Sequence, residues 1–447
     1  MNVATTMQTG NTSQEHGMAM HVTIFLLTQA ASIRFTDVRI ASVTLLPMAF
    51  SGAGEIVRLA QRMPDVWGIG ILASSPHGRF NAAASASHEW ISSSQPGERN
   101  LNYAPYAIDN KVGAIHNRTP GPNATHVDGT VEYDFHNLFG HRSLNATYYG
   151  LQALFPDDRP FVIGRSTFSG SGTVAGHWGG DNQYSGDTTE ELCGRWMQLS
   201  AFFSFYRNHY EEGALKHEAW RWPSVADFSR EIMKIRYSLF PYMYTLLNDA
   251  HETGFTFLRA LSWEFPQDSS LFGIDAQFLV GPGLMYTQAP AANTSGTATI
   301  DAPPGVLPLY IRGGTILPQQ APGYTVYESR QGSWSLLVAL DEDGNGSGTT
   351  YLDDGKSMSP QQTQRVTLAA QGKTLTAKIE GSYDFADYGV SPPPLDKVII
   401  MGLSSYVENT TQFNGKSVGA MYNAVDQTLI VQNGLLNLTS TGAWAQE

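Results

Sequence analysis

Two segments of the chain carry side chains that an active site would need. In RPFVIGRSTFSGSG, Arg165 follows an apolar run, and a short distance further on Asp181 stands in AGHWGGDN. A carboxyl group transfers protons and a guanidinium donates several hydrogen bonds, so the pair suits acid-base chemistry on a polar substrate. Each residue also has a structural explanation, because Asp in a Gly-Gly-Asp-Asn stretch is common in turns and Arg165 could form a structural ion pair.

The elements around these two segments indicate a parallel barrel. Residues 125–155 predict a short strand that leads into an amphipathic helix, and residues 160–164 (PFVIG) predict a strand that is apolar on both faces. The order of helix, buried strand and loop is typical of a (β/α) barrel, whose loops after the strands converge on one mouth. Arg165 and Asp181 would then lie at that mouth.

A long helix is expected from Ser224 onward. Apolar residues recur at spacings of three and four, Ser224 and Asp227 could form a capping box, and Gly254 could end the helix. Pro241 should kink this helix or divide it in two. Residues 255–265 follow with the pattern of a strand.

From residue 276 onward, short β-like runs alternate with Gly, Pro and Asp-Gly turns, which fits two packed β-sandwich units. The predicted fold class is therefore α/β plus all-β, with a partial (β/α)8 TIM barrel followed by two C-terminal β-sandwich domains. The expected domains are an unassigned N-terminal region (1–95), the C-terminal part of the barrel (96–263), a proximal β-sandwich (264–330) and a distal β-sandwich (331–447).

Composition narrows the class of protein. The formal net charge is −13 and only 15% of residues are charged, which argues against a nucleic-acid partner, because phosphate binding requires clustered Lys and Arg. Aromatic residues make up 11% of the chain, which suits sugar stacking and a large core equally. Cys193 is the single cysteine, so neither an internal disulfide nor a cysteine metal cluster is expected.

Glycosylation sequons favour a secretory route. The pattern Asn-X-Ser/Thr occurs at eight asparagines: Asn11, Asn117, Asn123, Asn145, Asn293, Asn345, Asn409 and Asn437. Residues 1–20 contain no Lys or Arg, so no clear signal peptide begins this chain. The apolar run 22–33 is too short to span a bilayer and is either a displaced signal-like segment or a core strand, the strand being favoured. We expect a secreted, extracellular glycoprotein that contacts no membrane.

Several long motifs resemble those of the family 31 glycoside hydrolases, and most of all the fungal α-glucosidases and α/β-glucosidases. They run in the family's order from about residue 125 to the C-terminus, over about two thirds of the chain. The segments are HVDG-VEYDFHNLFGH, RPFVIGRSTFSGSG, AGHWGGDN, EELCGRWMQLSAFFSFYRNH, RALSWEFP, PLYIRGGTILP and YLDDG.

The resemblance implies a role for four residues. In that family the Asp of the HW-GDN motif is the general acid/base, which falls on Asp181. Arg165 and His209 would hold sugar hydroxyls beside the scissile bond, and Trp178 would line the same pocket. A raised pKa at Asp181, supplied by an apolar neighbour such as Trp178, would keep its proton available near working pH.

The chain also departs from the family pattern. Retaining glycosidases need a second carboxylate as nucleophile, and the family's W-x-D-M-N/S-E motif occurs nowhere before Asp181, so the nucleophile is unknown. QYSGDTTE joins GGDN directly to EELC, where the family has a further strand and loop, and the stretch before PLYIRGG is shortened. Barrel-like sequence covers only residues 125–263, whereas a complete barrel takes roughly 250 residues.

The resemblance implies a glycoside hydrolase that releases glucose from the non-reducing ends of oligosaccharides with retention of configuration. It is of the α-glucosidase type, with β-glucosidase activity as a further option. The alternatives are a non-catalytic carbohydrate-binding remnant, a chain whose exons were joined incorrectly, and an inactive extracellular fragment that carries β-sandwiches. An oligosaccharide is the expected partner, no cofactor or metal is expected, and the oligomeric state stays open.

Overall fold

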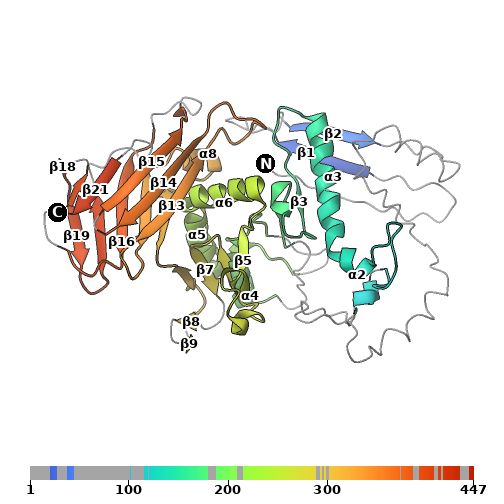
Figure 1. The fold of residues 1–447 in the computed structure, drawn as a ribbon, viewed down its shortest axis with the longest axis horizontal. Coiled ribbons are helices and arrows are strands. Elements are labelled where there is room, and N and C mark those ends of the chain that lie inside the picture. Colours follow the sequence, from blue (N-terminus) through green and yellow to red (C-terminus); the bar gives the residue numbers. More distant parts are fainter. Residues whose placement is uncertain are drawn as a thin grey trace. The chain divides into compact units, whose positions relative to one another are not determined.

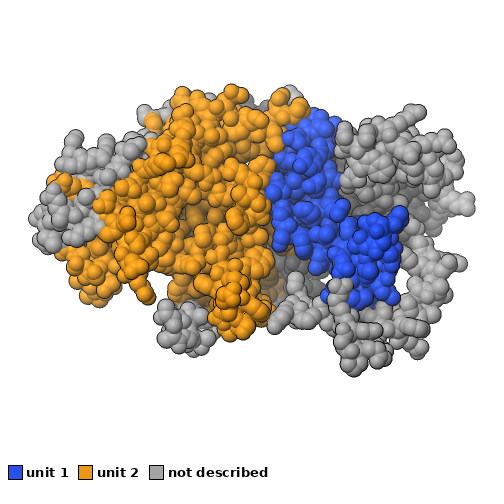
Figure 2. Space-filling view, in the orientation of Figure 1, with its two compact units in different colours: residues 1–28, 35–155, 160–175 blue, residues 29–34, 156–159, 176–447 orange. Residues whose placement is uncertain are grey.

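The computed structural model describes residues 21–27, 38–44, 101, 115–118, 120–179, 188–208, 215–287, 292–293, 296–297, 302–372, 374–385, 392–406, 411–413, 416–432 and 442–446. The chain divides into two compact units, coloured separately in Figure 2. The first unit comprises residues 1–28, 35–155 and 160–175, and the second comprises residues 29–34, 156–159 and 176–447.

The first unit combines a strand pair with one long helix. Strands β1 (His21–Leu27) and β2 (Val38–Thr44) pair antiparallel, so the apolar run 22–33 begins as a strand. The other elements are η4 (Ile115–Arg118), α2 (Glu132–Phe135), η5 (His136–Leu138), α3 (Phe139–Leu154), β3 (Ile163–Gly164) and η6 (Ser171–Thr173).

Helix α3 confirms the helix predicted within residues 125–155, and an isolated bridge between Thr125 and Val131 takes the place of the expected short strand. A Cβ at Gly164 would lie 2.8 Å from the Leu144 side chain, so glycine lets β3 approach α3 closely. The strand predicted over 160–164 is reduced to Ile163 and Gly164, preceded by the buried Val162.

Helices begin the second unit after the short strand β4 (Gly176–His177). They are α4 (Glu190–Ser200), η7 (Ala219–Arg221), α5 (Pro223–Ser238) and α6 (Phe240–Thr253). Pro241 lies at the start of α6, so the helical pattern is divided at Leu239, as expected. Gly254 ends α6 with φ of 77°, a left-handed conformation that glycine adopts without strain.

The predicted capping box of Ser224 and Asp227 is wrong. Pro223 occupies the first turn of α5 and Trp222 precedes it without a side-chain cap, because proline has no N–H that needs a partner there. Ser224 Oγ instead donates to Glu190 Oε1, and Asp227 pairs with Arg230 on the exposed face of the helix.

A four-stranded antiparallel sheet follows the helices, in the order β10-β7-β6-β5. The segments here are β5 (Leu258–Ala260), α7 (Leu261–Glu264), η8 (Ser269–Leu271), β6 (Gln277–Val280), β7 (Leu284–Thr287), β8 (Ala292–Asn293), β9 (Gly296–Thr297) and β10 (Leu309–Ile311). A strand was predicted over residues 255–265, and only Leu258–Ala260 (β5) of that range forms one. The sheet and helices α5 and α6 share one core, which includes Phe202, Met243, Val280 and Leu284.

The remaining strands form a larger sheet in the order β18-β17-β21-β15-β14-β13-β11-β12-β16-β20-β19. Their bounds are β11 (Thr315–Gln320), β12 (Trp334–Ala339), β13 (Gly346–Leu352), β14 (Gln364–Gln371), β15 (Thr374–Gly381), β16 (Leu395–Met401), β17 (Thr411–Phe413), β18 (Lys416–Ser417), β19 (Ala420–Asn423), β20 (Thr428–Gln432) and β21 (Gly442–Gln446), with α8 (Val326–Ser329) between β11 and β12. Figure 1 shows these strands in orange and red.

The two halves of this sheet pack against each other as a β-sandwich. Strands β11 and β13 join its two halves through a single residue pair, Thr315 with Ser347. Both halves contribute to one hydrophobic core, with Trp334, Leu336 and Val338 from one half and Val366 and Leu368 from the other. The β-rich C-terminal region predicted from residue 276 onward is therefore confirmed.

Strand β11 links the two cores of the second unit. Ile316 belongs to the sandwich core, whereas the next residue, Leu317, belongs to the core of the helices and the four-stranded sheet, because successive side chains of a strand point to opposite faces. The domain limits at 96, 264 and 331 stay predictions. Strand β11, before the limit at 331, and strand β12, after it, pair antiparallel in one sheet.

Candidate active site

Trp178 follows β4 directly and packs against a second segment of the predicted site. The edge of Phe205 meets its ring at a centroid distance of 5.7 Å and an interplanar angle of 78°. The Arg207 guanidinium lies 5.6 Å from the centre of the same ring, within the range of a cation–π contact. Ser204 Oγ donates to the carbonyl of His177 at 2.7 Å. Residues 177–178 and 204–207 thus lie side by side.

A buried arginine holds the start of this second segment. Arg236 of α5 donates to the carbonyl oxygens of Ala201, of Phe203 at 2.7 Å and of Ser204 at 3.4 Å. Burial lowers the pKa of Arg236 to about 10, so the group stays charged at neutral pH. The guanidinium thus satisfies backbone carbonyl groups in the turn that follows α4.

His217 contacts two residues that border the undescribed parts of the predicted site, Thr188 and Asn208. Its Nε2 lies 2.5 Å from Thr188 Oγ1, and its backbone carbonyl accepts a hydrogen bond from Asn208 Nδ2 at 2.6 Å. Thr188 follows the loop that contains Asp181, and Asn208 immediately precedes His209. Through its imidazole and its backbone carbonyl, His217 therefore contacts Thr188, which follows the Asp181 stretch, and Asn208, which precedes His209.

A small cavity of about 20 Å³ lies beside His217. It has room for about one water molecule. The cavity is lined by Thr188, Leu192, Cys193, Trp196, Met197, Ser200, Arg207, Asn208 and His217. Cys193 is buried here, as the sequence indicated, and desolvation raises the pKa of its thiol. Thr188 and His217 are both buried, so their contact is shielded from bulk water.

The four predicted site residues fall into three groups. Trp178 is half-buried in the second unit, in contact with the segment that leads to His209. Arg165 is exposed in the first unit, directly after β3. Asp181 and His209 lie outside the described residues. The structure therefore brings Trp178 together with Phe205 and Arg207, and the roles of Arg165, Trp178, Asp181 and His209 stay predictions.

The sequons have varied settings. Asn123 is exposed, Asn145 is half-buried on α3 and Asn345 is half-buried in the turn before β13. The backbone of Asn117 lies in η4 and that of Asn293 in β8. Asn11, Asn409 and Asn437 lie outside the described residues. Attachment of glycans at these positions stays a prediction.

Sequence reasoning did not identify Phe205, Arg207, Arg236 or His217 as supports of the site. Phe205 and Arg207 stand in the FYRNH segment, where two aromatic residues and an arginine lie close to His209, so a signal was available for both. Arg236 and His217 make their contacts through the fold, with no motif around them. Of the described residues, no group of three or more His, Cys, Asp or Glu side chains is arranged to bind a metal ion.

The pH dependence of stability should reveal the buried state of His217. Burial, and then the nearby Arg221, lower its pKa from the ordinary value of 6.5, while Glu218 opposes the shift. The unfolded chain therefore binds a proton at this residue more readily, and stability is lost as pH falls below about 6.5. We expect His217→Gln to lose less free energy of unfolding than the wild type between about pH 7 and about pH 5.

Urea unfolding at the two pH values provides the measurement. His251→Gln, which replaces an exposed histidine of α6, is the control for the loss of an imidazole as such. If wild type and His217→Gln lost the same free energy of unfolding between the two pH values, the His217 imidazole would have the same pKa in the folded and the unfolded chain, which would contradict the prediction.

The fold and motifs described above define a chain built from part of a TIM-barrel domain and the β domains that follow it. The model for the glycosyl hydrolases family 31 TIM-barrel domain matches residues 80–187 and 183–246, and the model for the family's C-terminal domain matches residues 254–300. The chain belongs to glycoside hydrolase family 31.

Similar proteins include fungal enzymes and solved structures. The chain is 41% identical to an α-glucosidase of Aspergillus niger over 78% of its own length, and 40% identical to glucoamylase 1 of Schwanniomyces occidentalis over 80%. The glucosidase II alpha subunit superposes on 74% of this chain with a TM-score of 0.61 at 22% identity. A family 31 dextranase of Flavobacterium johnsoniae covers the same share with a TM-score of 0.55 at 20% identity.

These relatives are longer than the chain. It spans 41% of the Aspergillus niger enzyme, 43% of the Schwanniomyces occidentalis enzyme and 44% of the glucosidase II subunit. The solved structures support the shared fold, in agreement with the predicted partial barrel followed by β domains. Within the described residues, no helix combines the length and the apolar character that a membrane crossing requires.

Proposed function

We propose that this chain acts as a glycoside hydrolase of the α-glucosidase type, releasing glucose from the non-reducing ends of oligosaccharides. Family membership and 41% identity to a fungal α-glucosidase support this reaction class. Retention of configuration, β-glucosidase activity and the length of the substrate are finer parts of the same proposal. Sequons at eight asparagines support a secreted, extracellular glycoprotein.

The observation that carries the proposal is the packing of Trp178 against Phe205 and Arg207. This contact sets Trp178, which precedes Asp181 by three residues in the sequence, beside Phe205 and Arg207, which shortly precede His209. We assign Asp181 as the general acid/base, and Arg165, Trp178 and His209 as the side chains that bind the sugar. An acid carboxyl near an indole ring would keep its proton at neutral pH, because desolvation disfavours the charged form. The nucleophile remains unassigned.

The function is tested by incubating the pure full chain with maltose and with 4-nitrophenyl α-glucoside. The proposal predicts release of glucose from maltose and of nitrophenol from the aryl glucoside, both above the rate of a buffer blank. Substitution of Trp178 by alanine should raise the KM for maltose, because the sugar loses an aromatic face. Rates equal to the blank on both substrates would contradict the proposal.

A second function is favoured by one sequence feature, the lack of W-x-D-M-N/S-E before Asp181. A chain without the nucleophile would bind a glucose oligomer and leave it intact. Calorimetry with maltotriose separates the two functions. Heat of binding that disappears in Trp178→Ala, together with no glucose release, supports the binding protein. Heat of binding that disappears in Trp178→Ala, accompanied by glucose release from the wild type, supports the glycoside hydrolase.

A further inference from the structure

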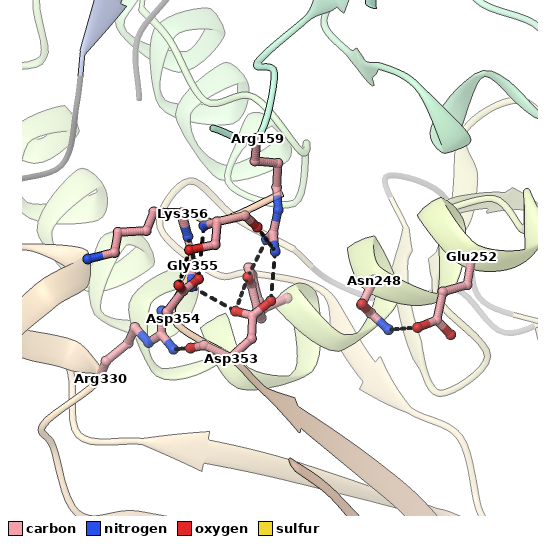
Figure 3. Close-up of polar contacts among 10 residues, drawn as sticks. Arg159, Asn248, Glu252, Arg330, Asp353, Asp354, Gly355 and Lys356 are labelled. Carbon is pink, nitrogen blue, oxygen red and sulfur yellow. Dashed lines mark hydrogen bonds and ion pairs between the residues drawn. The ribbon is translucent and has the colours of Figure 1, made fainter. Parts of the chain in front are cut away.

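A buried carboxylate lies at the end of β13, in the YLDDG motif. Asp353 is 0% exposed. Its Oδ1 accepts hydrogen bonds from the Tyr244 hydroxyl at 2.5 Å and from the backbone N–H of Gly355 at 2.8 Å, and its Oδ2 accepts from Arg159 Nη2 at 2.9 Å (Figure 3). A buried charge is costly unless it is paired and hydrogen-bonded, and Asp353 meets both conditions.

Arg159 makes further contacts with the same loop. Its Nη1 donates to the Tyr244 hydroxyl at 2.9 Å, and its Nη2 donates to the carbonyl of Ser357 at 3.1 Å. Although burial alone would lower it, the pKa of Arg159 is raised, because Tyr244 and Asp353 stabilise the charged guanidinium. One arginine side chain thus bridges helix α6 and the loop after β13.

Backbone pairing adds to these side-chain contacts. The N–H of Arg159 donates to the carbonyl of Lys356 at 3.0 Å, and the N–H of Met358 donates to the carbonyl of Asp157 at 3.0 Å. Asp158 and Ser357 form an antiparallel bridge between them. Residues 157–159 are therefore attached to residues 356–358 through main chain as well as side chain.

The loop is itself held in shape by local bonds. Arg330 donates to the backbone carbonyl of Asp353, and its guanidinium lies 5.7 Å from the centre of the Tyr244 ring. Asp354 accepts hydrogen bonds from the backbone N–H groups of Lys356 and Ser357, each at 3.0 Å, and from the Ser357 hydroxyl. Figure 3 shows Arg159 and Arg330 both meeting this loop at Asp353. A loop with its polar groups satisfied in this way is a rigid support.

The attached segment continues directly into the predicted sugar-binding segment. Arg159 is followed by the apolar stretch with the buried Val162, then by β3 and Arg165. We propose that the loop Asp353–Ser357 is a positioning element, in which Asp353 and Arg159 fix the start of the segment that presents Arg165 to the sugar. The role of Arg165 rests on the proposed function, whereas the fixing of residues 157–165 does not.

Hydrogen exchange of the full chain tests this proposal. Asp353→Asn removes the charge that pairs with Arg159, and Tyr244→Phe removes one hydroxyl and leaves the ring in place. We expect amide exchange in residues 160–165 to become about tenfold faster in Asp353→Asn and to change in the same direction, by less, in Tyr244→Phe. Arg159→Lys, which keeps the positive charge, should restore part of the protection lost in Arg159→Ala.

The chain offers a matched control. Asp249 of α6 pairs with Arg365 of β14 at 2.9 Å, so Asp249→Asn also breaks an ion pair between α6 and the β-sandwich but touches no residue of 157–159. It should leave exchange in 160–165 unchanged. Equal exchange of this peptide in Asp353→Asn and Asp249→Asn would overturn the proposal, even if both variants lost the same thermal stability.

A kinetic measurement separates this inference from the proposed function. If the wild type hydrolyses maltose, Asp353→Asn should raise the KM for maltose several-fold with a smaller effect on kcat, because a displaced Arg165 weakens sugar binding. Asp249→Asn should leave the KM unchanged. If the wild type releases no glucose, the proposed function fails, and the exchange of residues 160–165 still decides whether the loop fixes this segment.

Discussion

Replacing Asp181 with asparagine is expected to lower kcat for maltose hydrolysis by about 10²–10⁴-fold. An amide has nearly the shape of a carboxyl group but cannot give a proton to the oxygen that leaves the anomeric carbon. The KM should change little, because binding by Arg165, Trp178 and His209 is retained in this account. Glucose release measured over a range of maltose concentrations separates the two constants.

Asp187→Asn is the matched control for this variant, because it removes a carboxylate from the same stretch between Trp178 and Thr188. It should retain activity within a few-fold of the wild type, an effect typical of a residue outside the chemistry. Similar losses in both variants, or full activity in Asp181→Asn, would remove Asp181 from the role of general acid/base.

Replacing Trp334 with alanine is expected to cost about 3–5 kcal/mol of unfolding free energy. Trp334 is 0% exposed and lies in the core to which both halves of the β-sandwich contribute, with Leu336 and Val338 on the same face of β12. Alanine would leave a large cavity there, since the surrounding strands are held by their hydrogen-bonded ladders and collapse only in part. Urea unfolding followed by circular dichroism measures the loss.

Trp220→Ala serves as the comparison, because Trp220 in η7 is 73% exposed. Its removal should change the free energy of unfolding by no more than about 0.5 kcal/mol. A loss for Trp334→Ala as small as that for Trp220→Ala would mean that the β-sandwich does not depend on this ring.

Local patterns predicted the helices and the β-rich region of the fold. The spacing of apolar residues indicated α3, α5 and α6, and the chemistry of Pro241 and Gly254 placed the division and the end of the helical pair. The capping box failed because Pro223 starts α5 without a side-chain cap. The strand at 160–164 came out shorter because Ile163 and Gly164 alone make ladder bonds.

The supports of the candidate site could not be predicted in the same way. Arg236 bonds to carbonyls more than thirty residues earlier, and Arg159 reaches Asp353 across 194 positions. Contacts of this kind depend on how the elements pack, and a single arginine or aspartate in a sequence has no periodicity that indicates its partner. The YLDDG motif was visible as a family likeness, but its bond to residues 157–159 emerged only from the fold.

The most direct test is a crystal structure of the full chain soaked with glucose. We expect the Asp181 carboxyl, the Arg165 guanidinium and the His209 imidazole all to lie within about 3 Å of hydroxyl or anomeric oxygens of one sugar, above the ring of Trp178. For a retaining enzyme, a second carboxylate should stand about 5–5.5 Å from Asp181. An Asp181 side chain that points into bulk solvent, remote from Arg165 and His209, would contradict the account.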